Sequence, residues 1–62
     1  MVLLDTLIRN DFSLRFYLKG KGYKIIFTTP GGVRTNEYET YDEAKDNFRE
    51  TAEENDMVSL GD

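Results

Sequence analysis

Apolar and polar residues alternate through the first half of the chain. From Phe12 to Lys19, every second residue is phenylalanine or leucine, and the residues between them are polar, charged or tyrosine. This period of two is typical of a β-strand with one buried face. Gly20-Lys21-Gly22 then favours a tight turn, since glycine accepts positive φ without steric cost. The alternation resumes from Tyr23 to Thr28, so the two segments predict a β-hairpin.

A third strand is predicted from Val33 to Glu39. It follows a second turn at Thr29-Pro30-Gly31-Gly32, where proline can preset one turn dihedral and glycine can follow it. Within this strand, Val33 and Tyr38 fall on opposite faces unless a β-bulge shifts the register. The residues expected to face the core in the first two strands are Phe12, Leu14, Phe16, Leu18, Tyr23, Ile25 and Phe27.

The hydrophobic period becomes helical after residue 39. Thr40 and Glu43 have the spacing of a capping box, in which a threonine and a glutamate satisfy free amides at a helix start. Asn55 is the expected stop. One apolar stripe of this helix can lie on the sheet: Tyr41, Ala44, Phe48 and Ala52.

The two ends of the chain are expected to complete the core. Near the N-terminus, apolar residues at 2, 3, 4, 7 and 8 predict a short helical turn. Near the C-terminus, Met57, Val58 and Leu60 are expected to fold back over an open side. The prediction is therefore one α+β domain over residues 1–62: a three-stranded antiparallel sheet packed against one main C-terminal helix (β-β-β-α), with a short N-terminal helix.

Length and composition limit what this domain can be. With 62 residues, it buries only about 60% of the surface of its unfolded chain. It has no cysteine and no histidine, which excludes a zinc site made of thiolates or imidazoles and favours the cytoplasm over secretion. The N-terminus has no signal-peptide pattern, and no segment is apolar enough to span a membrane.

Charge is distributed unevenly. The net charge is −4, with six basic against two acidic side chains through residue 36 and ten acidic against two basic side chains from residue 37 onward. Such an asymmetry can steer a charged partner, although it also fits a basic sheet neutralised by an acidic helix of the same fold.

No motif indicates catalysis. Without histidine the usual base for nucleophilic catalysis is missing, and the carboxylates cluster on a predicted exposed helix. Gly20 and Gly22 lie between two strands, unlike the glycines of a nucleotide-binding loop, and the acids lack the spacing of a calcium loop. We therefore expect no enzyme activity, no cofactor and no metal.

Two surfaces can bind a partner. The outward sheet face is expected to display basic and aromatic residues together, a combination that can follow phosphates and stack bases: Arg15, Tyr17, Lys19, Lys24, Ile26, Arg34 and Tyr38. The helix is expected to display acids, some of them four residues apart: Asp42, Glu43, Asp46, Glu50, Glu53 and Glu54. Four residues advance a helix by about 6 Å, close to two phosphate steps along a DNA strand. Either set can also be an ordinary solvated face.

The span from Gly22 to Glu50 resembles a known family in its pattern of residues. The likeness rests on Gly22-Tyr23-Lys24-Ile25-Ile26-Phe27, then Arg34, then Thr40-Tyr41-Asp42-Glu43-Ala44 leading into Phe48. These residues are similar to the arm-type DNA-binding domain of tyrosine-family phage and transposon integrases. The resemblance implies a three-stranded sheet with a C-terminal helix, in which the sheet enters the major groove. This chain departs from that family in its acidity.

Three functions remain open from the sequence. The preferred one is a small protein-binding inhibitor whose acidic helix blocks a basic, nucleic-acid-binding surface of a target protein. Inhibitors of phages and mobile elements, including anti-CRISPR and other DNA-mimic proteins, are similar in size and charge. The alternatives are a nucleic-acid-binding module that uses the sheet face, and a structural or regulatory homodimer built through Tyr17, Ile26 and Tyr38.

Overall fold

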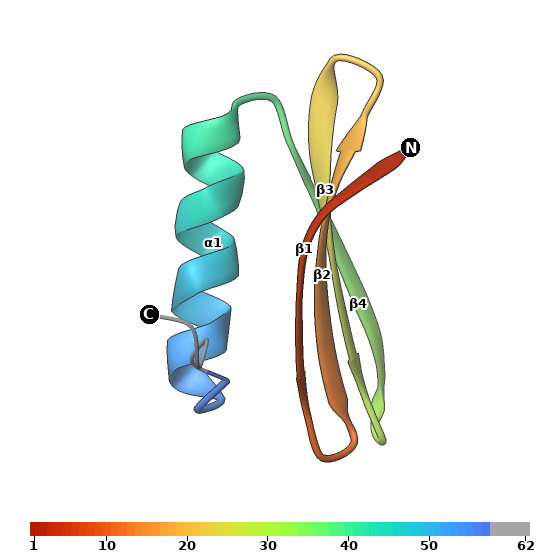
Figure 1. The fold of residues 1–62 in the computed structure, drawn as a ribbon, viewed down its shortest axis with the longest axis vertical. Coiled ribbons are helices and arrows are strands. Elements are labelled where there is room, and N and C mark those ends of the chain that lie inside the picture. The colour runs from red at the N-terminus through yellow and green to blue at the C-terminus, as the bar shows by residue number, and fades with distance from the viewer. Residues whose placement is uncertain (58–62) are drawn as a thin grey trace.

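The computed structural model describes residues 1–57. It contains an antiparallel sheet of four strands in sequence order, with one helix lying across one face (Figure 1). The strands are β1 (Val2–Arg9), β2 (Phe12–Lys19), β3 (Gly22–Thr29) and β4 (Gly32–Tyr38), and the helix is α1 (Tyr41–Glu54). The α+β class and the C-terminal helix are as predicted, but the sheet has four strands instead of three.

The error lies at the N-terminus, where residues 2–9 form β1 and not a helical turn. Between Leu3 and Asp5 the pairing of β1 with β2 is interrupted by a bulge that leaves Leu4 without a partner. The apolar residues at 2, 3, 4, 7 and 8 do not alternate because β1 has apolar residues on both faces: Leu7 pairs with the buried Leu14, whereas Ile8 is exposed. The bulge adds a shift of register at Leu4. Asn10-Asp11 was the missed turn signal: Asn10 has φ 54°, and Arg9 pairs directly with Phe12.

The two central strands match the prediction closely. β2 has the expected bounds, and β3 is longer by one residue at each end. The turn between them contains Gly20 at φ 59°, in the region that favours glycine. No bulge interrupts the pairing of β3 with β4, so Val33 and Tyr38 do lie on opposite faces of the sheet.

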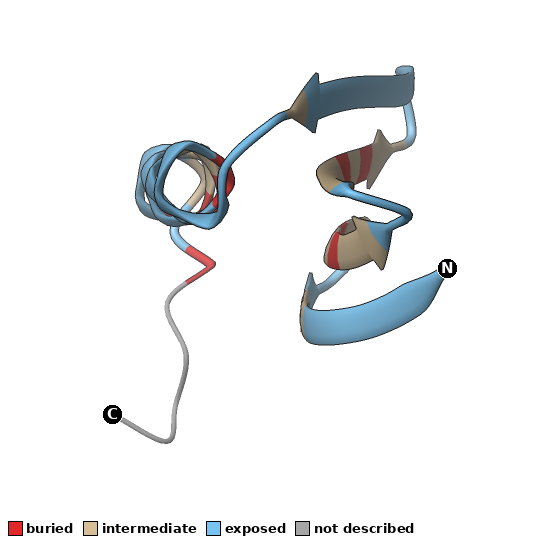
Figure 2. Ribbon diagram, turned by 90° about the horizontal axis from the view of Figure 1, so that it is seen from above, coloured by how far each residue is buried: buried red, intermediate tan, exposed pale blue. Residues whose placement is uncertain are grey.

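The core is one apolar layer between the sheet and α1 (Figure 2). Phe16 of β2 stacks at 5.6 Å between ring centroids on Phe48 of α1, and Ala44 and Ala52 lie one helical turn to either side. The small alanines allow the helix backbone to approach the strands, while Phe48 fills the space between them. The buried residues are Leu14, Phe16, Ile25, Phe27, Ala44, Phe48, Ala52 and Met57.

The start of α1 is fixed by Thr40, as predicted. Its hydroxyl accepts a hydrogen bond from the Glu43 backbone amide at 3.3 Å and donates one to the Glu43 carboxylate at 2.9 Å. One of the free amides at the helix start is thereby satisfied. Among residues 1–57, α1 is the only helix, and it is too short and too polar to cross a membrane.

The end of α1 turns the chain back onto the core. Asn55 is the C-cap, Asp56 has φ 57°, and the Met57 amide donates to the Ala52 carbonyl at 2.6 Å. This left-handed residue followed by a hydrogen bond to the preceding turn is a Schellman motif, which commonly brings together the two apolar residues that it links. The predicted return of Met57 to the core is confirmed, and Val58 and Leu60 lie outside the described residues.

Arg9 of β1 holds the helix end to the sheet. Its Nη1 atom donates to the Asp56 carbonyl at 2.9 Å and lies 2.9 Å from the Asp56 carboxylate. The last turn of α1 has no basic residue of its own. Arg9 therefore supplies, from another element, the positive charge that a helix C-terminus favours.

A substitution at Met57 tests whether the chain turns back onto the core after α1. We expect Met57→Ala to lower the free energy of unfolding by about 2 kcal/mol or more, because it leaves a cavity in a thin core. Met1→Ala is the matched control, since Met1 is 69% exposed and Met57 only 3%. Urea unfolding measures both variants, and equal stabilities would contradict the placement of Met57.

Candidate functional site

The buried stripe of α1 determines which residues of the helix face the solvent. Ala44, Phe48 and Ala52 are four residues apart and point at the sheet. The opposite side of α1 therefore carries the acids, and all six predicted helix residues are exposed. We call this surface the acidic face: Asp42, Glu43, Asp46, Glu50, Glu53 and Glu54.

Little positive charge compensates the acidic face. Arg49 pairs with Asp46 at 3.0 Å, with both side chains more than half exposed, and such surface pairs contribute little to stability. Lys45 lies over the Tyr41 ring at 5.8 Å. Within residues 1–57, Glu50, Glu53 and Glu54 have no ion pair.

The acids at the two ends of α1 differ in their effect on the helix. Asp42 and Glu43 lie in the first turn, where negative charge is favourable to the helix dipole. Glu53 and Glu54 lie in the last turn, where it is unfavourable, and Glu50 repels Glu54 one turn away. The C-terminal half of the acidic face therefore does not serve the stability of the helix.

The outer sheet face, on the side away from α1, holds five of the seven residues predicted for it. Arg15 lies opposite Ile26 and Tyr17 opposite Lys24 on neighbouring strands, and Lys19 follows at the end of β2. Side chains at these positions alternate with the buried residues of β2 and β3.

Arg34 and Tyr38 do not belong to this set, which corrects the predicted surface. Arg34 pairs with the buried Phe27, and its guanidinium lies 5.9 Å from the centre of that ring. Tyr38 pairs with Tyr23 and packs against the core. Both point to the side of the sheet that carries α1, because the turn after Thr29 pairs Phe27 with Arg34 and the same register continues without a bulge to Tyr38. The predicted dimer patch of Tyr17, Ile26 and Tyr38 is divided between two faces for the same reason.

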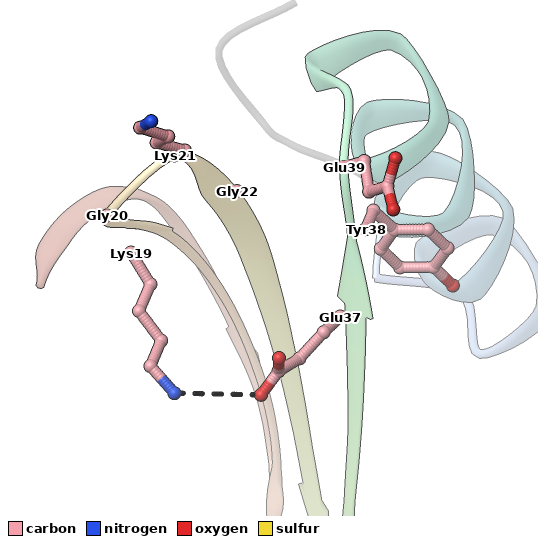
Figure 3. A pocket seen from close by; sticks show the side chains of 7 residues that line it. All are labelled: Lys19, Gly20, Lys21, Gly22, Glu37, Tyr38 and Glu39. Atoms are coloured by element: carbon pink, nitrogen blue, oxygen red, sulfur yellow. Dashed lines mark ion pairs between the residues drawn. The ribbon is translucent and has the colours of Figure 1, made fainter.

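Glu37 is a residue that sequence reasoning missed. It lies opposite Lys24 on the outer sheet face, and its carboxylate is 3.7 Å from the Lys19 ammonium (Figure 3). An acid among these lysines interrupts the basic track that a nucleic-acid backbone requires. Only the register of β4 could have revealed this position.

The same corner of the sheet forms an open depression (Figure 3). Gly22 lies between Lys19 and β4, and a Cβ atom added to it would come 2.9 Å from the Tyr38 carbonyl oxygen. Gly22 thus lets β4 approach closely and leaves room beside the Lys19 to Glu37 contact. The depression has both charges on its walls: it is lined by Lys19, Gly20, Lys21, Gly22, Glu37, Tyr38 and Glu39.

The described residues gather their charged side chains on the acidic face and on the outer sheet face. Within residues 1–57, no group of three or more acidic side chains is arranged to hold a metal ion. Comparisons with protein-family models, with curated proteins and with solved structures find no significant match to this chain.

The close approach of β4 to Gly22 can be tested by a measurement of stability. We expect Gly22→Ala to lower the free energy of unfolding by about 1–3 kcal/mol, because the new methyl group collides with the backbone of β4. Gly31→Ala is the control, since its Cβ would meet only the Thr29 hydroxyl at 3.7 Å. Guanidinium unfolding distinguishes the two, and a Gly22→Ala variant as stable as Gly31→Ala would show that β4 does not approach so closely.

Proposed function

We propose that this chain is a protein-binding module that presents the acidic face of α1 to a basic surface on another protein. The target surface is one that otherwise binds nucleic acid, so the module acts as an inhibitor that mimics DNA. The observation that carries this proposal is the set of six exposed carboxylates on α1, of which only Asp46 has an ion pair within residues 1–57.

The spacing of the acids supports mimicry. Asp42, Asp46, Glu50 and Glu54 follow one another at four-residue intervals along α1, which corresponds to about 6 Å per interval. Phosphates along one strand of DNA are about 3.4 Å apart, so each interval spans nearly two phosphate steps. A basic groove shaped for a phosphate backbone can therefore meet several of these carboxylates at once.

Glu50, Glu53 and Glu54 do not stabilise α1, and this also supports a role for them in binding. Like charges one turn apart and acids at a helix C-terminus each destabilise a helix by a few tenths of a kcal/mol. A partner with basic side chains would convert these unfavourable charges into favourable contacts across an interface. The phage and mobile-element inhibitors named above, anti-CRISPR proteins among them, are the class that this mechanism describes.

The outer sheet face supports direct nucleic-acid binding less well. Arg34 points to the other side of the sheet, and Glu37 lies beside both Lys19 and Lys24. The basic groups left on this face are Arg15, Lys19 and Lys24. We therefore keep the acidic face as the working surface.

Charge reversal on the acidic face tests the proposal. A tagged chain is used to capture partners from bacterial lysate with and without nuclease, and the affinity for a nuclease-resistant partner is then measured. We expect Asp46→Lys with Glu50→Lys to weaken that affinity about a hundredfold or more, since it places like charges in contact. Duplex DNA is expected to compete with the wild-type chain for the partner.

The control is Asp11→Lys with Glu37→Lys, which changes the net charge equally but lies away from α1, in the turn between β1 and β2 and on β4. We expect this variant to bind nearly as well as the wild type. Undiminished binding by the helix variant, or an equal loss in both variants, would refute the proposal. Capture that disappears with nuclease would instead favour the outer sheet face.

A further inference from the structure

β1 is an open edge of the sheet with apolar side chains. Among residues 1–57 it pairs only with β2, whereas α1 lies mainly over β2, β3 and β4. Ile8 is 67% exposed and Leu3 51% exposed. A long apolar edge strand is a template for pairing with another strand, and natural proteins usually protect it.

The free backbone groups of this edge can be assigned. Arg9 and Phe12 close the two-residue turn between β1 and β2, and in such hairpins the closing pair is hydrogen-bonded. Hydrogen-bonded pairs alternate along an antiparallel ladder, so Leu7 is bonded to β2 while Thr6 and Ile8 direct their amides and carbonyls outward. The hydrogen bond of the Thr6 amide supports this assignment, because the amide donates to the Asp5 side chain at 2.8 Å.

We propose that a second copy of this chain pairs with β1 in antiparallel orientation about a twofold axis at Leu7. Thr6 of each copy then exchanges backbone hydrogen bonds with Ile8 of the other, using the groups that point outward. Leu7 meets its own equivalent in a pair without hydrogen bonds, on the side of the sheet that carries α1. Because each Leu7 already packs against the core, the two cores become continuous.

Charge complementarity selects this register. With the axis at Leu7, Asp5 of each copy lies opposite Arg9 of the other, so two ion pairs form. Arg9 has capacity for the contact, because its contacts with Asn55 and Asp56 all use Nη1. Asp5 has no ion pair within residues 1–57. An axis at Asp5 would instead oppose two carboxylates.

The other edge strand lacks this self-complementarity. In β4, Arg34 lies on the face that carries α1 and Glu37 on the outer sheet face. No antiparallel self-pairing of β4 brings these two charges opposite each other, because paired residues share a face. Arg34 and Glu37 also have other contacts, with Phe27 and Lys19.

Electrostatic repulsion between the two acidic faces is small in this dimer. Strands lie about 4.8 Å apart, so helices centred two strands from the joined edges would be more than about 20 Å apart. That distance exceeds the Debye length of about 8–10 Å at physiological salt. Both acidic faces stay exposed, so the inference is independent of the proposed function.

A single cysteine tests the register. The chain has no cysteine, so Leu7→Cys introduces one thiol at the proposed axis. Residues in a pair without hydrogen bonds have Cα atoms about 4.5 Å apart, within the range of a disulfide. Mild oxidation is expected to crosslink most of this variant as a dimer. Val33→Cys, on the opposite edge, is the control; if it crosslinks equally, or if Leu7→Cys stays monomeric, the proposal is wrong.

Sedimentation equilibrium of the cysteine-free chain gives the second test. We expect a monomer–dimer equilibrium that Asp5→Lys weakens about tenfold or more, because each ion pair becomes a repulsion. Glu53→Lys makes the same charge change on the acidic face and is expected to leave the equilibrium nearly unchanged. A wild-type chain that remains monomeric at millimolar concentration, or a dimer insensitive to Asp5→Lys, would overturn the proposal.

Discussion

A single helix must cover the apolar face of a four-stranded sheet, and the rest of the structure depends on how it does so. The contact of Phe48 with Phe16 is central to this cover, flanked by alanines that let α1 approach the strands. Because α1 lies mainly over β2, β3 and β4, the core needs additional closure beside β1. Met57 and Arg9 provide it at the helix end, the first by burial and the second by binding the terminal carbonyls.

Because one helix covers one face of the sheet, three surfaces formed by residues 1–57 are not covered by other described residues. The outer side of α1 is acidic, the outer sheet face is mixed in charge, and β1 is apolar with free backbone groups. These surfaces have different chemistries and point in different directions, so the chain can use more than one of them. Pairing through β1 would join two copies and keep both acidic faces exposed for partners.

Sequence reasoning succeeded where a pattern was regular and local. The alternation in β2 and β3 and the capping threonine at Thr40 predicted those elements nearly to the residue. The prediction failed where the face that a residue occupies depends on how two strands pair. Apolar residues on both faces and the bulge at Leu4 made β1 resemble a helical turn. The pairing of β4 with β3 placed Arg34 and Tyr38 away from the predicted surface. Register is a property of two strands together, and one strand's sequence does not contain it.

The central claim is that Glu50, Glu53 and Glu54, the acids in the C-terminal half of α1, are present for a partner and not for the fold. Its most direct test is the free energy of unfolding of a chain with Glu50→Gln, Glu53→Gln and Glu54→Gln. Glutamine has nearly the helix propensity of glutamate, so the variant removes charge while it preserves the helix. Our account predicts a variant more stable than the wild type by about 0.5–1 kcal/mol at low salt, with a smaller gain at high salt. A less stable variant would show that these carboxylates hold the fold together, and would contradict the account.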